Sequence, residues 1–206
     1  MLDGRIETPR FNLHNEVMVR KHVHAAILSE LIRLSRLEDG DQKLSAHDLE
    51  ELREARESAF PAYIVTYLFE NERTYRQQPY DVSLLGTIIS KHKQHFLKTI
   101  QEIFAQYWPE NDRYVVSAPA LEQYIDDMPG RLQEVVDRLH GRLLWAVRVQ
   151  ERLLQAQLHG LLEPEEDRML GRCRRYLQQL AQKGMSNYTL TVLAVEGFLP
   201  GYGTYE

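Results

Sequence analysis

Four arginines and a tryptophan recur on one side of a helix that the sequence predicts between residues 130 and 160. These residues are Arg131, Arg138, Arg142, Trp145 and Arg152. At ~100° per residue they fall within about a quarter-turn of one another. Guanidinium groups bind phosphates and an indole ring stacks on a base, so this stripe is a candidate surface for DNA or RNA.

Two other interpretations of the stripe stay open. In the first, Glu134 neutralises the arginines and Trp145 packs on a neighbouring helix. In the second, the whole face docks onto another domain. A second basic cluster, Arg172, Arg174 and Arg175, lies on a later predicted helix and admits the same interpretations.

The other reactive side chains do not form a catalytic pattern. No G-x-x-x-x-G-K-[ST] loop is present to hold nucleotide phosphates. His92 and His95 lie three residues apart without a third ligand at helical spacing, which favours a solvated face over a metal site. His24 fits a hydrogen-bonded core histidine, and Cys173 fits a small, half-buried helix residue. We therefore expect no catalytic residue, metal or cofactor in this chain by itself.

Composition narrows the class of protein. The 206 residues are 43% hydrophobic and 27% charged, with a formal net charge of −5, which is ordinary for a globular chain and not for a strongly basic nucleic-acid binder. The one cysteine excludes an internal disulfide and fits a reducing, cytoplasmic location. No apolar run approaches the ~20 residues that span a bilayer, so no membrane partner is expected.

Hydrophobic spacing predicts an all-α, multi-helix bundle with long amphipathic helices and little or no strand. The expected helices cover about residues 15–36, 46–57, 61–77, 82–108, 119–127, 130–160, 163–183 and 187–196. For residues 187–196 a strand stays open as the alternative, because Thr and Val favour extended backbone. Ser45 and Asp48 form a capping box for the second helix. Pro129 separates the fifth helix from the sixth, and Gly184 is expected to be a left-handed cap.

The last residues favour a surface that docks onto something else. Phe198, Leu199, Pro200 and Tyr202 follow a short apolar run and stand between glycines. Exposed apolar side chains of this kind mark an interface between domains. We therefore expect residues 1–206 to be a single helical domain, cut from a longer protein.

Two segments carry a resemblance to a known family. They are Pro9–Leu13 with Val19-Arg20 and His22–Ala25, and Glu196–Gly203, which reads Glu-Gly-Phe-Leu-Pro-Gly-Tyr-Gly. Together they resemble a region that follows the motor in bacterial superfamily 2 (DEAD/DEAH-type) helicases. The relatives concerned are DISARM-like phage-defence helicases and proteins with a cysteine-rich C-terminal domain.

The resemblance implies a helical accessory domain that packs on the motor domains of its parent chain and guides DNA or RNA. ATP and Mg would belong to the parent protein, because the ATPase residues of the family lie outside this segment. The cysteine cluster of the relatives is also absent. A second hypothesis is a structural module that binds proteins and makes no contact with nucleic acid.

Overall fold

The fold was analysed in a computed structural model, which describes residues 15–37, 45–71, 74–107 and 117–201. Within these ranges the chain is mainly helical and holds a single small sheet. The helices are α1 (Glu16–Ser35), α2 (Ala46–Ala59), α3 (Val65–Leu68), α4 (Ser83–Lys91), α5 (Lys93–Tyr107), α6 (Ala118–Leu158), α7 (Pro164–Leu180) and α8 (Thr189–Val195). Strands β1 (Phe69–Asn71) and β2 (Thr74–Tyr75) form an antiparallel pair. The expectation of an all-α bundle with little strand is confirmed.

Several helices begin where their capping residues predict. The Asn15 side chain accepts a hydrogen bond from the Met18 amide at 3.2 Å and starts α1. Ser45 and Asp48 exchange both hydrogen bonds of a capping box at the start of α2, as expected. Each cap satisfies amides that have no partner within the first turn, so these boundaries follow from local sequence.

The expected helix over residues 61–77 is wrong except at Val65–Leu68. Only Val65–Leu68 is helical, and the chain then reverses through β1 and β2. The aromatic and β-branched residues of these strands favour extended backbone. The Asn71 side chain accepts a hydrogen bond from the Thr74 amide at 3.0 Å and closes the turn between the strands.

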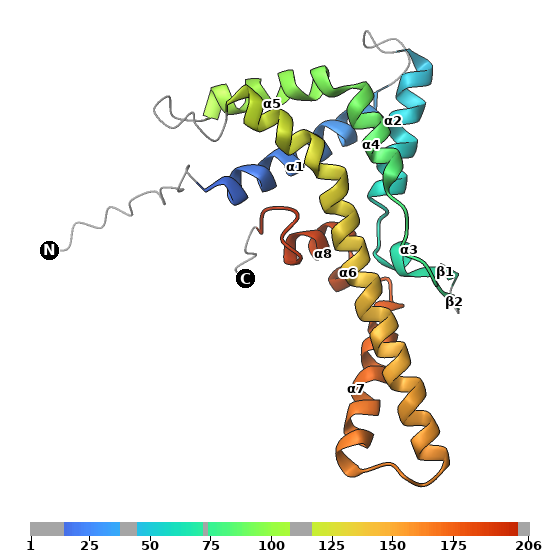
Figure 1. Ribbon diagram of the computed structural model, residues 1–206. Helices are drawn as coiled ribbons and strands as arrows, with labels where there is room; N and C mark the ends of the chain where they lie inside the picture. The colour runs from blue at the N-terminus through green and yellow to red at the C-terminus, as the bar shows by residue number, and fades with distance from the viewer. Residues whose placement is uncertain (1–14, 38–44, 72–73, 108–116, 202–206) are drawn as a thin grey trace, which may run out of the picture.

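The expected helix over 82–108 is divided in two at His92. This residue has φ −110° and ψ 19°, outside helical geometry, and its amide still donates to the Ile88 carbonyl at 3.0 Å. The chain changes direction there, so that α4 and α5 cover different parts of the core (Figure 1). Leu85 and Ile89 are buried from α4, and Phe96 from α5.

The expected break at Pro129 is also wrong, because α6 runs unbroken for 41 residues, or about 60 Å. Pro129 lies inside the helix, where it removes one backbone donor. Buried neighbours on both sides, Ile125 and Leu132, hold the helix against the core. Pro129 faces Gly86 of α4, where an added Cβ would lie 3.6 Å from the proline Cβ.

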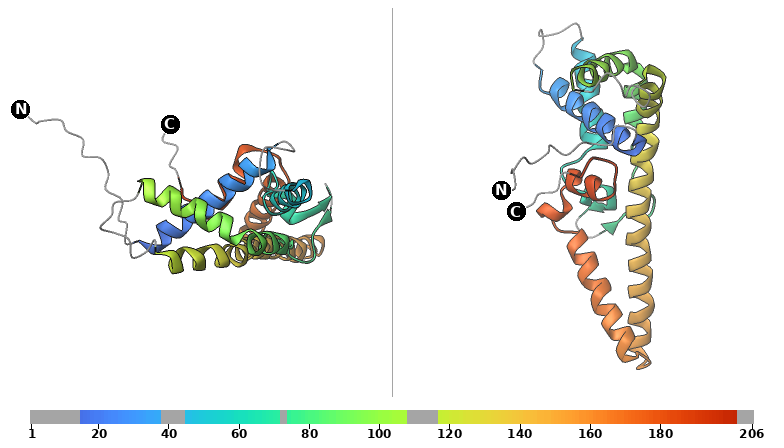
Figure 2. Two further views of the ribbon diagram at one scale, coloured as in Figure 1. Left: turned by 90° about the horizontal axis from the view of Figure 1, so that it is seen from above. Right: turned by 90° about the vertical axis from the view of Figure 1, so that its left-hand side faces the viewer.

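Helices α1, α2, α4, α5 and the first half of α6 form the helical body. The second half of α6 leaves this body and pairs with α7, as two views show (Figures 1 and 2). We call this projecting pair, residues 138–183, the hairpin. The chain turns at its tip through Gly160, which has φ +67°. Gly184 has φ −118°, so the expected left-handed cap at that residue is wrong.

After the hairpin the chain returns to the helical body. The Thr189 amide donates to the Ala62 carbonyl at 3.0 Å, and the Ile64 amide donates to the Asn187 carbonyl at 3.0 Å. These bonds join the start of α8 to the segment between α2 and α3. The expected helix near residues 187–196 is confirmed as α8. In the ranges that the structure describes, none of the helices combines the length and apolar character needed to cross a membrane.

Candidate nucleic-acid interface and adjoining pocket

The α6 stripe divides into two environments. Arg131 lies on the part of α6 that belongs to the helical body, Arg138 and Arg142 lie at the start of the hairpin beside Glu196, and Trp145 and Arg152 lie further along the hairpin. Arg131 is partly buried, whereas the side chains of Arg138 and Arg142 are each 50% exposed. The five residues therefore lie on one side of α6 but do not form one continuous surface.

Arg138 and Arg142 hold α8 against α6. The Arg142 guanidinium donates to the Glu196 carboxylate at 2.5 Å, and Arg138 Nε lies 3.7 Å from the same carboxylate. This ion pair raises the pKa of Arg142. Glu134, which was one expected neutraliser, forms no ion pair with Arg131 or Arg138 within the described structure. The acid that balances this part of the stripe comes from the far end of the chain.

The exposure of Trp145 argues against its packing on a neighbouring helix. The residue is 60% exposed on the hairpin. Arg152 is exposed on the same helix, two turns further along. An exposed indole flanked by arginine is a surface on which an unpaired base can stack.

The α7 helix carries a second row of arginines. Arg168, Arg172 and Arg175 recur every three or four residues, opposite the face that buries Leu170 and Cys173. All three are exposed and none has an ion-pair partner within the ranges that the structure describes. Arg174 of the predicted cluster is exposed as well, so the structure brings that cluster to the surface.

Charge is unevenly distributed between the hairpin and the rest of the chain. Residues 138–183 hold nine Lys and Arg against five Asp and Glu, whereas the whole chain holds 25 against 30. Four of those five acids lie between Glu163 and Asp167, at the tip. The shaft of the hairpin is therefore basic in a chain that is acidic as a whole.

The expected docking residues at the C-terminal end are not exposed. Phe198, Leu199 and Pro200 are buried, and Tyr202 lies outside the described residues. Phe198 stacks on His24 of α1 with ring centroids 4.5 Å apart. Gly197 makes this return possible because it has φ +79°, which favours glycine. The three residues close the chain's own core instead of presenting an apolar surface.

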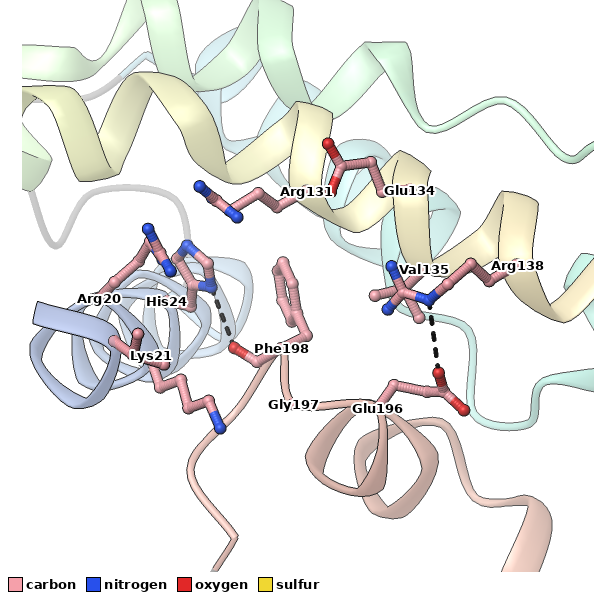
Figure 3. A pocket seen from close by; sticks show the side chains of 11 residues that line it. Arg20, Lys21, His24, Arg131, Glu134, Val135, Arg138, Glu196, Gly197 and Phe198 are labelled. Atoms are coloured by element: carbon pink, nitrogen blue, oxygen red, sulfur yellow. Dashed lines mark hydrogen bonds and ion pairs between the residues drawn. The ribbon is translucent and has the colours of Figure 1, made fainter.

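A pocket of about 130 Å³ lies where α1, α6 and the segment after α8 meet (Figure 3). Its polar lining is Arg20, Lys21 and His24 of α1, Arg131, Glu134 and Arg138 of α6, and Glu196. Arg20 has a long contact of 3.8 Å with Glu16. Lys21 and Arg131 make no ion pair among the residues described. The pocket therefore contains an excess of positive charge.

His24 forms the inner wall of this pocket. The histidine is only 2% exposed, and burial lowers its pKa to about 4 against the opposing effect of its bond to the Phe198 carbonyl. At neutral pH the ring is uncharged, so Nδ1–H donates to that carbonyl at 3.0 Å and Nε2 is left as an acceptor. No described group bonds to Nε2. The prediction of a hydrogen-bonded core histidine is confirmed.

His95 differs from its expected solvated setting. Its Nε2 lies 2.6 Å from the Glu30 carboxylate, which Arg33 also holds at 2.7 Å. The Arg33 hydrogen bonds, followed by His95, keep the pKa of the nearly buried Glu30 low. His92 and His95 therefore do not form a shared site, because His95 connects α5 to Glu30 of α1. Among the residues described, no three His, Cys, Asp or Glu side chains gather as metal ligands do.

Comparisons with protein-family models, curated proteins and solved structures find no match to this chain. The resemblance to helicase accessory regions therefore remains a prediction. The sequence did not single out Arg20 and Lys21, which line the pocket. The only indication in the sequence was that these two cations are adjacent on the helix that also carries His24.

Proposed function

We propose that this chain is a non-catalytic nucleic-acid-binding module whose hairpin contacts the phosphate backbone. The observation that carries the proposal is the second arginine row, Arg168, Arg172 and Arg175, which is exposed and has no acidic partner. Cations that are already paired gain little from a phosphate, whereas unpaired ones release counterions when they bind it. Trp145 and Arg152 on α6 would add stacking and further charge.

The first test measures binding of labelled single-stranded DNA, single-stranded RNA and duplex DNA at low and moderate salt. We expect wild-type affinity to fall steeply with salt. The double variant Arg168→Glu/Arg172→Glu should bind at least ~10-fold more weakly and show a shallower salt slope. Arg138 and Arg142 are poorer targets, because their reversal would also break the pairs with Glu196.

The matched control is Arg36→Glu/Lys98→Glu, which reverses two exposed charges on the helical body. This variant should keep at least half of the wild-type affinity, since its effect is limited to net charge. Equal loss in both double variants would show a non-specific charge effect and would contradict a hairpin site.

Trp145→Ala tests stacking separately from charge. Base stacking on an aromatic residue is worth about 1–3 kcal/mol, so affinity for single strands should fall about 5- to 160-fold. Affinity for blunt duplex should change little, because its bases are already stacked. An equal loss for both nucleic acids would assign Trp145 a structural role.

We further propose, from the resemblance alone, that the parent protein is a cytoplasmic, ATP- and Mg-dependent helicase whose motor domains pack on this chain. The phage-defence role belongs to the same proposal. A phosphate-binding loop upstream in the same reading frame would support it. A complete gene without such a loop would refute it and leave the hairpin test unaffected.

A second candidate function is protein binding through the hairpin tip. Leu158 and Leu161 are 77% and 71% exposed there, and Met169 lies on the first turns of α7. Apolar residues gathered at a projecting end are typical of contact with another protein. Leu158→Ser/Leu161→Ser should then abolish self-association or pull-down of the motor domains, and should leave nucleic-acid binding intact.

A further inference from the structure

We propose that the pocket between α1, α6 and the segment after α8 binds a hydrogen phosphate group, either free or as a phosphate monoester. The site lies beside the middle of α6, apart from the arginine row of α7 (Figure 3). The proposal does not depend on nucleic-acid binding by the hairpin.

The pocket carries more positive than negative charge. Arg142 and Arg138 already balance Glu196, whose side chain is 12% exposed between them. Lys21 and Arg131 have no ion-pair partner in the described part of the chain, although Arg131 Nε is buried. A buried, unpaired guanidinium donor is costly, and an anion in the pocket would satisfy it.

An unpaired hydrogen-bond acceptor, Nε2 of His24, lies beside these cations. Figure 3 shows the His24 ring between the guanidinium groups of Arg20 and Arg131, with its other nitrogen bonded to Phe198. Because Nδ1 donates to the Phe198 carbonyl, Nε2 presents a lone pair to the pocket. A ligand that fits must therefore accept hydrogen bonds from cations and also donate one to Nε2.

Hydrogen phosphate meets both requirements, and few other small anions do. Inorganic phosphate keeps at least one O–H near neutral pH, and a monoester keeps one in its monoanionic form. The other oxygens can accept from Arg20 and Arg131, while Lys21, whose amino group lies beside Gly197, adds positive charge to the pocket. Sulfate and a phosphodiester have no O–H and cannot donate to Nε2. The volume of about 130 Å³ accommodates one such tetrahedral group. The carboxylates of Glu134 and Glu196 also line the pocket, and they repel a fully deprotonated anion more strongly than a protonated one.

The test compares inorganic phosphate with sulfate at matched ionic strength and about pH 6.5, where every phosphate ion keeps at least one O–H and the mean charge is smaller than that of sulfate. Thermal unfolding is followed by circular dichroism, since a ligand that binds the native state raises the midpoint. Phosphate should raise the midpoint by several degrees and bind at least ~10-fold more tightly than sulfate. A purely electrostatic site would prefer sulfate, which carries the higher charge.

Arg131→Met and Lys21→Met remove one cation each and keep an unbranched side chain in the pocket. Each should weaken phosphate binding ~10-fold or more while the protein still unfolds cooperatively. The matched control, Lys98→Met, removes an exposed cation on α5 and should leave phosphate binding unchanged. His24→Gln should abolish the preference for phosphate over sulfate.

Two results would overturn the proposal: no difference between phosphate and sulfate with the wild-type protein, or unchanged phosphate binding by Arg131→Met. If His24→Gln does not fold, these two comparisons still test whether the pocket binds phosphate. An oligonucleotide with a 5′-phosphate, compared with its 5′-hydroxyl form, identifies the source of the group. A preference that Arg131→Met abolishes indicates a nucleic-acid end, and binding of inorganic phosphate alone indicates a free phosphate.

Discussion

At the scale of single residues, His24 links the stability of the protein to pH. Burial of the ring disfavours a positive charge on it, and Arg20 and Arg131 add to this effect, whereas the hydrogen bond to the Phe198 carbonyl opposes it. Its pKa is lowered from 6.5 to about 4 in the folded chain. The native state therefore binds fewer protons than the unfolded state between these two values.

We expect His24 to stabilise the fold fully above about pH 6.5 and to lose this contribution as pH falls towards 4. A shift of this size corresponds to about 3 kcal/mol of unfolding free energy. Burial lowers the pKa of His22 and His92 too, and adds to the same trend. Urea unfolding at several pH values measures it.

The variant for this measurement is His24→Phe, which should flatten the dependence of unfolding free energy between pH 6.5 and 4. Its control is His159→Gln, which changes an exposed histidine beyond the end of α6 and should keep the wild-type slope. An unchanged slope in His24→Phe would show that the histidine does not titrate as its burial implies.

At the scale of elements, α6 shows how packing overrides a local signal. Pro129 predicts a helix boundary, yet the helix continues because the residues around it are buried against α1 and α4. An interior proline costs a helix about 3 kcal/mol, through a lost hydrogen bond and a ring clash. The helix therefore keeps this proline at a cost in stability, where it touches α4 opposite Gly86.

Pro129→Ala should raise the unfolding free energy by about 1–3 kcal/mol, since the new amide can donate to the carbonyl one turn earlier. The smaller end of this range allows for lost contact with Gly86. The comparison is Pro164→Ala at the first turn of α7, where no internal bond is gained, and a change below about 0.5 kcal/mol is expected. Destabilisation by Pro129→Ala would indicate that the ring packs too well to be replaced.

At the scale of the whole molecule, the hairpin and the helical body differ in how they are held. The body surrounds a shared core of buried residues from α1, α2, α4, α5 and α6. The outer half of the hairpin has α7 as the partner of α6, as Figure 1 shows. Elements with fewer buried contacts open at lower free energy than the core.

Hydrogen exchange followed by mass spectrometry should therefore show two levels of protection. Amides of residues 148–158 and 164–175 should exchange faster than those of residues 19–31 and 121–143. Added single-stranded DNA should slow exchange in the hairpin alone if the arginine row binds it. Uniform protection along α6 would contradict the division into body and hairpin.

The sequence by itself determined the class of fold and most helix starts. Apolar residues at helical spacing and caps such as Ser45 with Asp48 act within a few residues, so they can be interpreted without the rest of the chain. The same is true of the buried setting of His24 among apolar neighbours. The arginine positions on α6 also followed from helical periodicity.

Tertiary structure alone decided what those arginines contact. Glu196, and not the nearby Glu134, pairs with Arg138 and Arg142, and Phe198 closes the core beside His24. Each of these contacts joins residues more than fifty positions apart, so local spacing carries no information about them. The helix continues through Pro129 for a similar reason. Packing of α6 against distant parts of the chain stabilises the helix by more than the proline destabilises it locally.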